Sequence, residues 1–194
     1  MIARALRRTS AFFMDIVEVF VISMSIFIVV YLFLMQPHQV KGNSMFPTYH
    51  DGEYLMTDKV SYRFRTPKRG EVVVFKAPIN EDFDFIKRVI GVPGDRVMVK
   101  GGSIYVNGIE IEETYLPPEY ETRGGRFLRE GVEVVVPENS YICIGDNRGH
   151  SSDSREWGPV PIENFVGRGF FRYWPLNKIG IVGNDGAAPF AALN

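Results

Sequence analysis

A shortage of cysteine and of excess charge narrows what this chain can do. Its 194 residues include one cysteine, Cys143, which excludes an internal disulfide and a cysteine-based metal cluster. Lysine and arginine total 22 against 23 aspartate and glutamate, a net charge of −1. Nucleic-acid binding depends on clustered basic residues, so we expect no nucleic-acid partner. Cys143 lies in the apolar run YICI and is expected to be a small buried residue.

One long apolar run is present, close to the amino terminus. Val19 to Met35 are 17 consecutive residues without a charge, which meets the lower bound for spanning a hydrocarbon layer of ~30 Å. A cleavable secretory signal is the alternative, but its apolar region is usually shorter and a small-x-small site follows it. The run here ends in QPHQVKG, which contains no such site. We therefore predict an uncleaved transmembrane anchor over residues 11–36.

The charges that flank the anchor predict its orientation. Three arginines lie in the first ten residues, whereas Lys41 is the only basic residue within about 20 residues after the span. Positive charge remains on the cytoplasmic side, so residues 1–10 are expected in the cytoplasm and residues 37–194 outside it. Asp15 and Glu18 are expected at or near the lipid headgroups.

After the anchor, short apolar runs alternate with Gly, Pro and Asn, a pattern typical of antiparallel sheet. Gly101-Gly102 and Asn107-Gly108 are suited to two-residue hairpin turns. The polar, Pro/Gly-rich residues 117–131 are predicted to form a surface loop or a loose hairpin. Strands are predicted at residues 71–75, 85–90, 96–100, 103–106, 109–111, 132–136 and 141–144. The fold class expected is therefore mainly β, an antiparallel sheet or coiled barrel preceded by a single transmembrane helix.

Ser44 lies in the stretch VKGNSMFPTYHDGEY, a few residues after the anchor. The nucleophile elbow G-x-S-x-G is excluded, because Phe46 stands where the second glycine would be. A Ser–His–Asp triad would need His50 or His150, and neither lies in a sequence context that indicates a positioned base. On its own, Ser44 is equally consistent with a hydroxyl that is satisfied in a turn.

Lys87 is the other candidate base for a serine nucleophile. In the predicted strand 85–90, Phe85 and Val89 lie on the same face as Lys87, with Ile86 and Ile90 opposite. Apolar surroundings disfavour an ammonium group and lower the pKa of a lysine from about 10.4. The pattern permits an uncharged amine, although a lysine on a solvated strand face fits it as well.

Three longer motifs occur in a fixed order after the anchor. They are GNSMFPT at residues 42–48, FIKRVIGVPGD at residues 85–95 and GDNRGHSSDSREWG at residues 145–158. Together with DGEYLMTDKVSYRF between the first two, they resemble the bacterial type I signal peptidase family. Members of that family are membrane-bound serine proteases that remove signal peptides from exported proteins. The resemblance extends from the anchor to about Trp174.

The resemblance implies a role for five residues. Ser44 would be the nucleophile and Lys87 the general base, and the hydroxyl of Ser151 would orient the lysine amine. Asp153 and Arg155 would form a supporting ion pair. Their i, i+2 spacing would place both on one face if that segment were extended.

The sequence departs from the family at the residue two before the nucleophile. Many members have a serine there that donates to the oxyanion, and this chain has Gly42. The oxyanion hole is then expected to rest on the backbone N–H groups of Ser44 and Gly42. Asp146, Asn147 and Gly149 are assigned to ordinary turn chemistry.

By the same resemblance the substrates are signal peptides of exported preproteins, cleaved after small-x-small sites held in shallow apolar pockets. Met45, Phe85 and Ile86 are the candidate pocket residues. No cofactor and no metal are implied. The protein would be a single-pass, monomeric protein of a bacterial plasma membrane, with the lipid bilayer as its other partner.

Two other functions are weighed against this one. The first is a self-cleaving repressor or related Ser–Lys peptidase, which typically carries a DNA-binding domain or cleavable linker where this chain has a membrane span. The second is a membrane-tethered binding module that has the fold but not the catalysis. It is disfavoured because the five residues to which the resemblance gives roles are all present, namely Ser44, Lys87, Ser151, Asp153 and Arg155.

Overall fold

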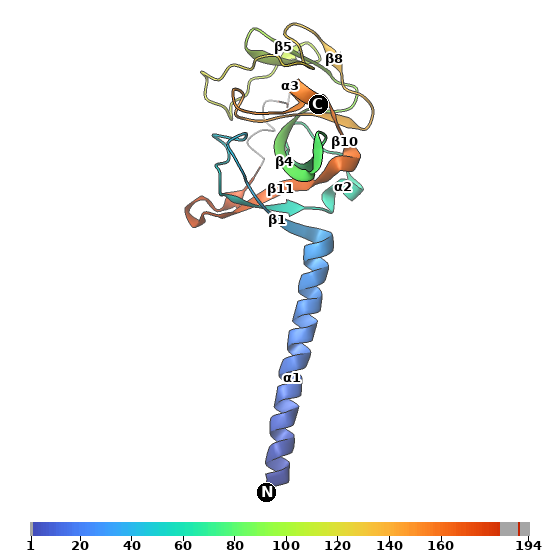
Figure 1. Cartoon of the computed structure of the whole chain (residues 1–194), viewed down its shortest axis with the longest axis vertical. Coiled ribbons are helices and arrows are strands. Elements are labelled where there is room, and N and C mark those ends of the chain that lie inside the picture. The colour runs from blue at the N-terminus through green and yellow to red at the C-terminus, as the bar shows by residue number, and fades with distance from the viewer. Residues whose placement is uncertain (1, 183–189, 191–194) are drawn as a thin grey trace.

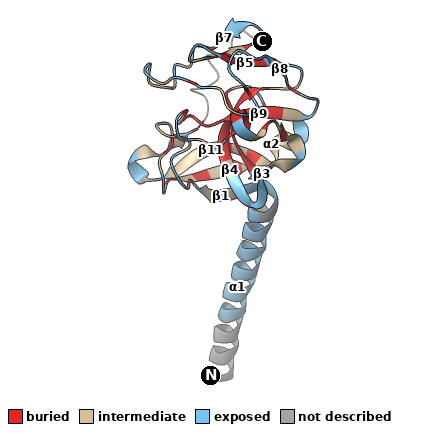
Figure 2. Ribbon diagram, turned by 45° about the horizontal axis from the view of Figure 1, so that its top comes forward, coloured by how far each residue is buried: buried red, intermediate tan, exposed pale blue. Residues whose placement is uncertain are grey.

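A long amino-terminal helix and a β domain make up the molecule (Figure 1). The structure, a computed structural model, describes residues 2–182 and 190. Helix α1 (Ile2–Val29) continues into a π-helical turn, η1 (Val30–Leu34), and projects away from the β domain. Its stretch Phe12–Val29 is long and apolar enough to cross a membrane, and its side chains are exposed (Figure 2).

The predicted anchor, residues 11–36, differs from this helix at both ends. The helix begins before residue 11, and Met35 and Gln36 already belong to the first strand, β1 (Met35–Gln39). The backbone turns extended at Met35, whose N–H still donates to the carbonyl oxygen of Val30. The apolar run Val19–Met35 therefore includes the first residue of a strand, since apolarity alone does not mark where a helix ends.

The larger of two antiparallel sheets has eight strands, which confirms the predicted fold class. Their order is β1-β2-β11-β3-β4-β9-β10, and β12 pairs with β11. Besides β1, the strands are β2 (Tyr54–Asp58), β3 (Val72–Ala77), β4 (Asn80–Gly91), β9 (Ser140–Ile144), β10 (Val160–Pro161), β11 (Phe165–Trp174) and β12 (Gly180–Ile181).

The smaller sheet has four strands in the order β7-β6-β5-β8. They are β5 (Arg96–Lys100), β6 (Ser103–Val106), β7 (Ile109–Glu110) and β8 (Val134–Val135). Both predicted two-residue turns are present. Gly101 and Gly102 have φ of 61° and 87°, and Asn107 and Gly108 have φ of 54° and 82°. Positive φ at both central positions is what a hairpin with the twist of a β-sheet requires.

Helical structure beyond β1 is sparse. Among the described residues no helix after Gln39 exceeds four residues; the short ones are α2 (Ser61–Phe64), α3 (Ser154–Trp157), η2 (Ile162–Asn164) and η3 (Leu176–Lys178). Residues 117–131 contain no helix and no named strand. Phe127 and Leu128 attach this segment to the carbonyl oxygen of Arg155, at N···O distances of 2.8 and 3.1 Å.

Strand β11 is the longest element that the sequence patterns do not predict. Its residues are mostly half-buried without a period of two, and Gly167 and Gly169 interrupt it. A Cβ on Gly167 would lie 2.2 Å from the carbonyl oxygen of Asp58, so the backbone of β11 approaches β2 closely. Glycine in a strand often marks such a close approach.

Buried apolar side chains form three clusters around the sheets. One fills the space between the smaller sheet and the ends of β4 and β9, and includes Ile90, Val97 and Ile142. A second lies beneath the β1–β2 connection, and a third includes Cys143, which is fully buried as predicted. The connection itself, residues 40–53, is closed at its base because the Val40 N–H donates to the carbonyl oxygen of Glu53 at 2.8 Å.

Candidate active site

The β1–β2 connection holds Ser44 in a series of turns. The N–H of Phe46 donates to the carbonyl oxygen of Asn43 at 3.1 Å, and that of Tyr49 to the carbonyl oxygen of Met45 at 2.9 Å. The side chains of Met45 and Tyr49 are buried in the core cluster below. Ser44 lies between these attachments and is half-buried, so its hydroxyl stands at the surface of a fixed loop.

Lys87 lies in the middle of β4 and points at this serine. Its Nζ is 2.6 Å from Oγ of Ser44, within hydrogen-bond distance. The lysine is only 3% exposed, and Val73 of β3 pairs with it across the sheet. The Nζ atom also lies 5.2 Å from the centre of the Phe85 ring. The sheet therefore encloses the amine and leaves it against the hydroxyl.

Burial is the main influence on the protonation of Lys87. It lowers the pKa of the amine from 10.5 to about 8, although the nearby charges of Asp153 and Asp146 and the thiol of Cys143 raise it, and Arg155 lowers it further. Near pH 8 about half of the molecules would then carry a neutral amine that can accept a proton. The amine has both the distance and the pKa of a general base for Ser44.

The Asp153–Arg155 ion pair is present, but the segment that carries it is not extended. Asp153 caps the short helix α3, and its Oδ1 accepts a hydrogen bond from the backbone N–H of Arg155 at 3.1 Å. The guanidinium folds back and donates from Nε and Nη2 to the same carboxylate, both at 2.8 Å. Burial alone would raise the pKa of Asp153, but the bonds and charge of Arg155 keep it below its usual value. A second carboxylate oxygen accepts from the N–H of Gly145.

Asp146 does more than turn chemistry, which corrects the interpretation of this residue from the sequence. It is fully buried and pairs with Arg88 of β4 through two hydrogen bonds, 2.9 Å from Nε and 2.7 Å from Nη2. The hydroxyl of Thr48 also donates to it at 2.6 Å. The pair thus connects β4 to the loop that carries the serine. An arginine inside the apolar run FIKRVI was the signal that could have revealed it.

Asn147 likewise holds the serine loop and is not only a turn residue. Its backbone N–H donates to the carbonyl oxygen of Ser44 at 3.0 Å, and Nδ2 donates to that of Asn43 at 2.9 Å. Gly145 allows this approach, because a Cβ there would lie 2.5 Å from the Ser44 oxygen. Gly149 is exposed, with nothing within 4 Å of its Cβ position.

The backbone N–H of Gly42, expected in the oxyanion hole, has another acceptor. It donates to Oδ1 of Asp51 at 2.7 Å and is therefore not free for an oxyanion in this structure. Gly42 has φ of 78°, a conformation that a serine would adopt only with strain. The N–H of Ser44 has no hydrogen-bond acceptor among the described residues.

Ser151 and the two histidines do not contact the dyad through hydrogen bonds. The Oγ of Ser151 is buried and lies near the carboxylate of Asp153, whose pKa it helps to lower, and within the described residues it forms no hydrogen bond to Lys87. His50 lies 3.2 Å from Nζ of Lys178 and stacks edge-on with Phe46. His150 is exposed, and no hydrogen bond joins either ring to the serine within the described chain.

A cleft of about 270 Å³ opens beside the dyad. The three predicted pocket residues, Met45, Phe85 and Ile86, all line it, together with Ser44 and Lys87. Met45 and Ile86 also belong to the buried cluster below. The cleft is thus lined by the turns of residues 39–45, by the strand residues 84–87 and by His150 and Ser152, with Met45 and Ile86 as its apolar floor.

Comparison with known proteins gives this geometry a context. The model of the family described as signal peptidase, peptidase S26, matches residues 13–174. A probable signal peptidase I-2 of Synechocystis is 42% identical over 161 residues, covering 79% of this chain and 69% of the relative. Signal peptidase IB of Staphylococcus aureus strain COL is 38% identical, covering 75% of this chain and 81% of the relative.

A solved structure of a signal peptidase I from Enterococcus faecalis V583 is 27% identical and covers 54% of this chain and 97% of that one, with a TM-score of 0.46. Such limited structural similarity adds nothing to the sequence comparison. The family match and the curated relatives agree, and each extends over most of the chain. This chain belongs to the signal peptidase, peptidase S26, family of membrane-bound serine endopeptidases.

Proposed function

We propose that Ser44 and Lys87 form the catalytic dyad with which this peptidase cleaves signal peptides from exported preproteins. The observation that carries the proposal is the 2.6 Å distance between Oγ of Ser44 and Nζ of Lys87. It is supported by the burial that lowers the pKa of the lysine to about 8. A hydroxyl within 2.6–3.2 Å of a neutral amine can lose its proton as it attacks.

The reaction is acyl transfer in two stages. Neutral Lys87 accepts the proton of Ser44 while Oγ attacks the carbonyl carbon before the cleaved bond. The N–H of Ser44, which has no acceptor in the described chain, donates to the oxyanion that forms. Protonated Lys87 then gives its proton to the leaving amine. Water repeats the sequence on the ester, with Lys87 as base, and releases the carboxylate of the signal peptide.

The cleft favours small residues one and three positions before the cleaved bond. Side chains at alternate positions of an extended peptide point to one side, so these two would enter the cleft together. A cleft of about 270 Å³ that also has to hold the peptide backbone leaves room for small side chains only. Met45, Phe85 and Ile86 supply its apolar surface.

The arrangement in the membrane follows from the anchor. With residues 1–10 in the cytoplasm and the β domain outside, a single span places the dyad on the side where signal peptides emerge. Ser44 follows the end of η1 at Leu34 by ten residues, so the dyad stays close to the membrane surface. We propose that the chain acts as a monomer, since one copy supplies both Ser44 and Lys87.

Cleavage of a preprotein by the purified full chain in detergent tests the dyad. Ser44→Ala and Lys87→Ala are each expected to lower kcat/KM by about 10³-fold or more, as loss of a nucleophile or base does. Lys100→Ala removes an exposed lysine of β5 and is the control, expected to keep wild-type activity. Cleavage that persists in Lys87→Ala would exclude the lysine as base.

Products of the wild-type reaction test the specificity. Their termini should map to a bond that follows a small-x-small sequence. Replacing the small residue directly before the cleaved bond of the preprotein by leucine should abolish cleavage at that bond. Efficient cleavage after leucine would show that the small cleft does not select the substrate.

A further inference from the structure

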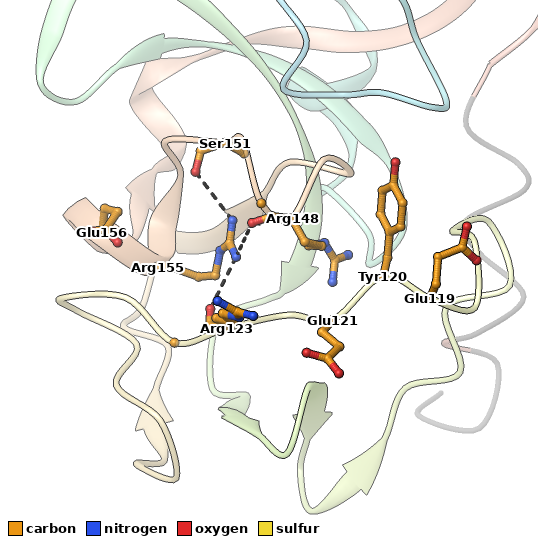
Figure 3. A pocket seen from close by; sticks show the side chains of 10 residues that line it. Glu119, Tyr120, Glu121, Arg123, Arg148, Ser151, Arg155 and Glu156 are labelled. Carbon is orange, nitrogen blue, oxygen red and sulfur yellow. Dashed lines mark hydrogen bonds between the residues drawn. The ribbon is translucent and has the colours of Figure 1, made fainter.

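A second and larger pocket lies beside the catalytic loop, with a volume of about 560 Å³ (Figure 3). Its walls come from the irregular segment 119–124 and from residues 148–156, which include the short helix α3. A pocket of this size falls in the range that binds ligands. It is distinct from the cleft at the dyad, because the two have no lining residue in common.

The two pockets are separated by one short stretch of chain. Of its residues, His150 and Ser152 line the cleft at the dyad, whereas Gly149 and Ser151 line the second pocket. Oγ of Ser151 and the carbonyl oxygen of Ser44 lie 2.2 and 2.5 Å from the same point, the position a Cβ of Gly145 would take. The wall of the second pocket therefore begins next to the backbone of Ser44.

Three arginines line the second pocket, and two of them, Arg148 and Arg155, are already neutralised. Arg155 donates to the carboxylate of Asp153. It also donates to the carbonyl oxygens of Arg148, Arg123 and Ser151, at 2.9, 3.3 and 3.5 Å (dashed lines in Figure 3). Arg148 donates from both terminal nitrogens to Glu113 at 2.5 Å. These pairs fix the walls, and they leave no net positive charge there to attract an anion.

The rim carries an excess of negative charge. Glu119, Glu121 and Glu156 are exposed carboxylates around the opening, against the exposed Arg123. Glu119 and Glu121 form no ion pair within the described chain, and Glu156 has only a distant one, 3.8 Å from Arg126. Such a rim attracts a cation and repels an anion.

We infer that this pocket binds the first residues of the mature protein, those after the cleaved bond, and favours basic side chains there. The inference rests on the proposed function. If the signal-peptide part of the substrate occupies the cleft, the residues after the cleaved bond extend away from Ser44 outside that cleft. The wall of the second pocket begins next to the backbone of Ser44, and an extended peptide covers about 13 Å in four residues, at ~3.3 Å each. Residues two to four after the bond are the ones that reach the rim.

The inference is tested with two preproteins. They are identical except that one has Lys and the other has Glu at the second, third and fourth positions after the cleaved bond. The wild-type full chain in detergent is expected to cleave the Lys form with about three- to fivefold higher kcat/KM, the size of effect that exposed charges produce. Glu119→Gln with Glu121→Gln should bring this ratio close to one. Glu119→Lys with Glu121→Lys should reverse it. High salt should reduce the wild-type preference.

The matched control is Glu112→Gln with Glu138→Gln, which removes two exposed carboxylates that do not line the pocket. It should leave the Lys/Glu ratio at the wild-type value. A preprotein with alanine at the three positions reports folding, since every variant should cleave it within twofold of wild type. Equal cleavage of the Lys and Glu forms by the wild type overturns the inference and leaves the proposed function standing. If the wild type cleaves none of the three preproteins, while its fold is intact, the proposed function itself has failed.

Discussion

As the proposed general base, Lys87 has to be uncharged in a site that also contains two carboxylates. Burial lowers its pKa to about 8 against the opposing charges of Asp153 and Asp146. Each of those carboxylates is bound by its own arginine, Arg155 and Arg88, with two hydrogen bonds. The negative charge near the amine is thus largely balanced before the substrate arrives, which is why burial prevails.

The rate of acylation should depend on pH through this lysine. Because the neutral amine is the active form, kcat/KM is expected to rise tenfold per pH unit below about pH 8 and to level off above it. A pH series of single-turnover cleavage, with substrate side chains that do not titrate in the range, measures the profile. A flat profile, or a rate that falls as pH rises through neutrality, would contradict a lysine base.

The same lysine should destabilise the fold at neutral pH. Its pKa in the folded state, about 8, lies below the unfolded value of 10.5, so the folded chain binds fewer protons between these values. The penalty is complete below about pH 8 and disappears as pH rises through 10.5. Lys87→Met should therefore raise the free energy of unfolding at pH 7 by up to about 3 kcal/mol.

Unfolding in detergent at pH 7 and at pH 10.5 measures this gain. The stabilisation by Lys87→Met should shrink at the higher pH, whereas Lys100→Met, at an exposed position, should change little at either. A variant less stable than wild type at pH 7 would contradict a pKa of Lys87 that is lowered by folding.

Gly145 should be indispensable for the position of the nucleophile. A Cβ there would lie 2.2 Å from Oγ of Ser151 and 2.5 Å from the carbonyl oxygen of Ser44, so one of the two loops has to move. A displacement near 1 Å can reduce a rate about 10²-fold. Gly145→Ala is expected to lower kcat by that order, whereas Gly149→Ala, where nothing lies within 4 Å, should stay within threefold. Equal activity of the two variants would show that the loops adapt.

Among the helices, strands and turns, the sequence predicts those elements whose conformation depends on residues close together in the chain. The two hairpin turns of the smaller sheet require positive φ, which Gly101-Gly102 and Asn107-Gly108 supply, and both form as predicted. Strands β2 and β11 carry no such local signal, because their pairing depends on contacts between residues more than a hundred positions apart. Tertiary packing decides elements of this kind.

The same limit applies to the candidate site. The motifs of the sequence lead to Ser44 and Lys87, whose side chains meet, and to the Asp153–Arg155 pair. They do not lead to Asp146, because its partner Arg88 lies 58 residues earlier in the chain. Only the fold brings the two together.

The hairpin formed by β11 and β12 should matter for catalysis although it does not reach the dyad. Arg172 donates from Nη1 to the carbonyl oxygen of Thr48 at 3.3 Å and to the buried carboxylate of Glu53 at 3.0 Å. Lys178 donates to the same carboxylate at 3.1 Å. Glu53 closes the base of the serine loop through Val40, so the hairpin holds that loop from below.

Arg172→Met should leave the Glu53 carboxylate buried with a single cation. Removing one partner of a buried pair costs about 3–5 kcal/mol, so the loop should loosen. We expect kcat/KM to fall at least tenfold with the pH midpoint unchanged, since Lys87 is not touched. Arg126→Met, at an exposed arginine, is the control. Wild-type activity and stability in Arg172→Met would show that the loop does not need this support.

For the whole molecule, the direct passage from helix to sheet is the main structural fact. The π-helical turn ends at Leu34 and β1 begins at Met35. The carbonyl oxygen of Leu34 also accepts from the N–H of Lys59, at the end of β2, at 3.0 Å. No linker separates the helix from the eight-stranded sheet. With the helix in the membrane as proposed, the loop that carries Ser44 would be held at one height above the bilayer.

A linker at this junction should impair only the reaction at the membrane. Inserting ten Gly/Ser residues between Leu34 and Met35 in the full chain separates the domain from the helix by about 16–19 Å r.m.s., at roughly 5–6 Å times the square root of their number. Cleavage of preproteins in liposomes should slow about tenfold or more, because the local concentration of the site at the bilayer falls. Cleavage of a short soluble peptide should be unchanged. Equal loss with both substrates would indicate damage to the sheet.

The rigid junction has a geometric corollary. Rotation of the helix about its long axis would also rotate the sheet. The opening of the cleft could then face any direction parallel to the plane of the bilayer. Any membrane component bound to one face of the helix would stop that rotation and fix the direction in which the cleft opens. In the proposed membrane arrangement, the direction in which the cleft opens would thus be set inside the lipid, by side chains that take no part in the chemistry.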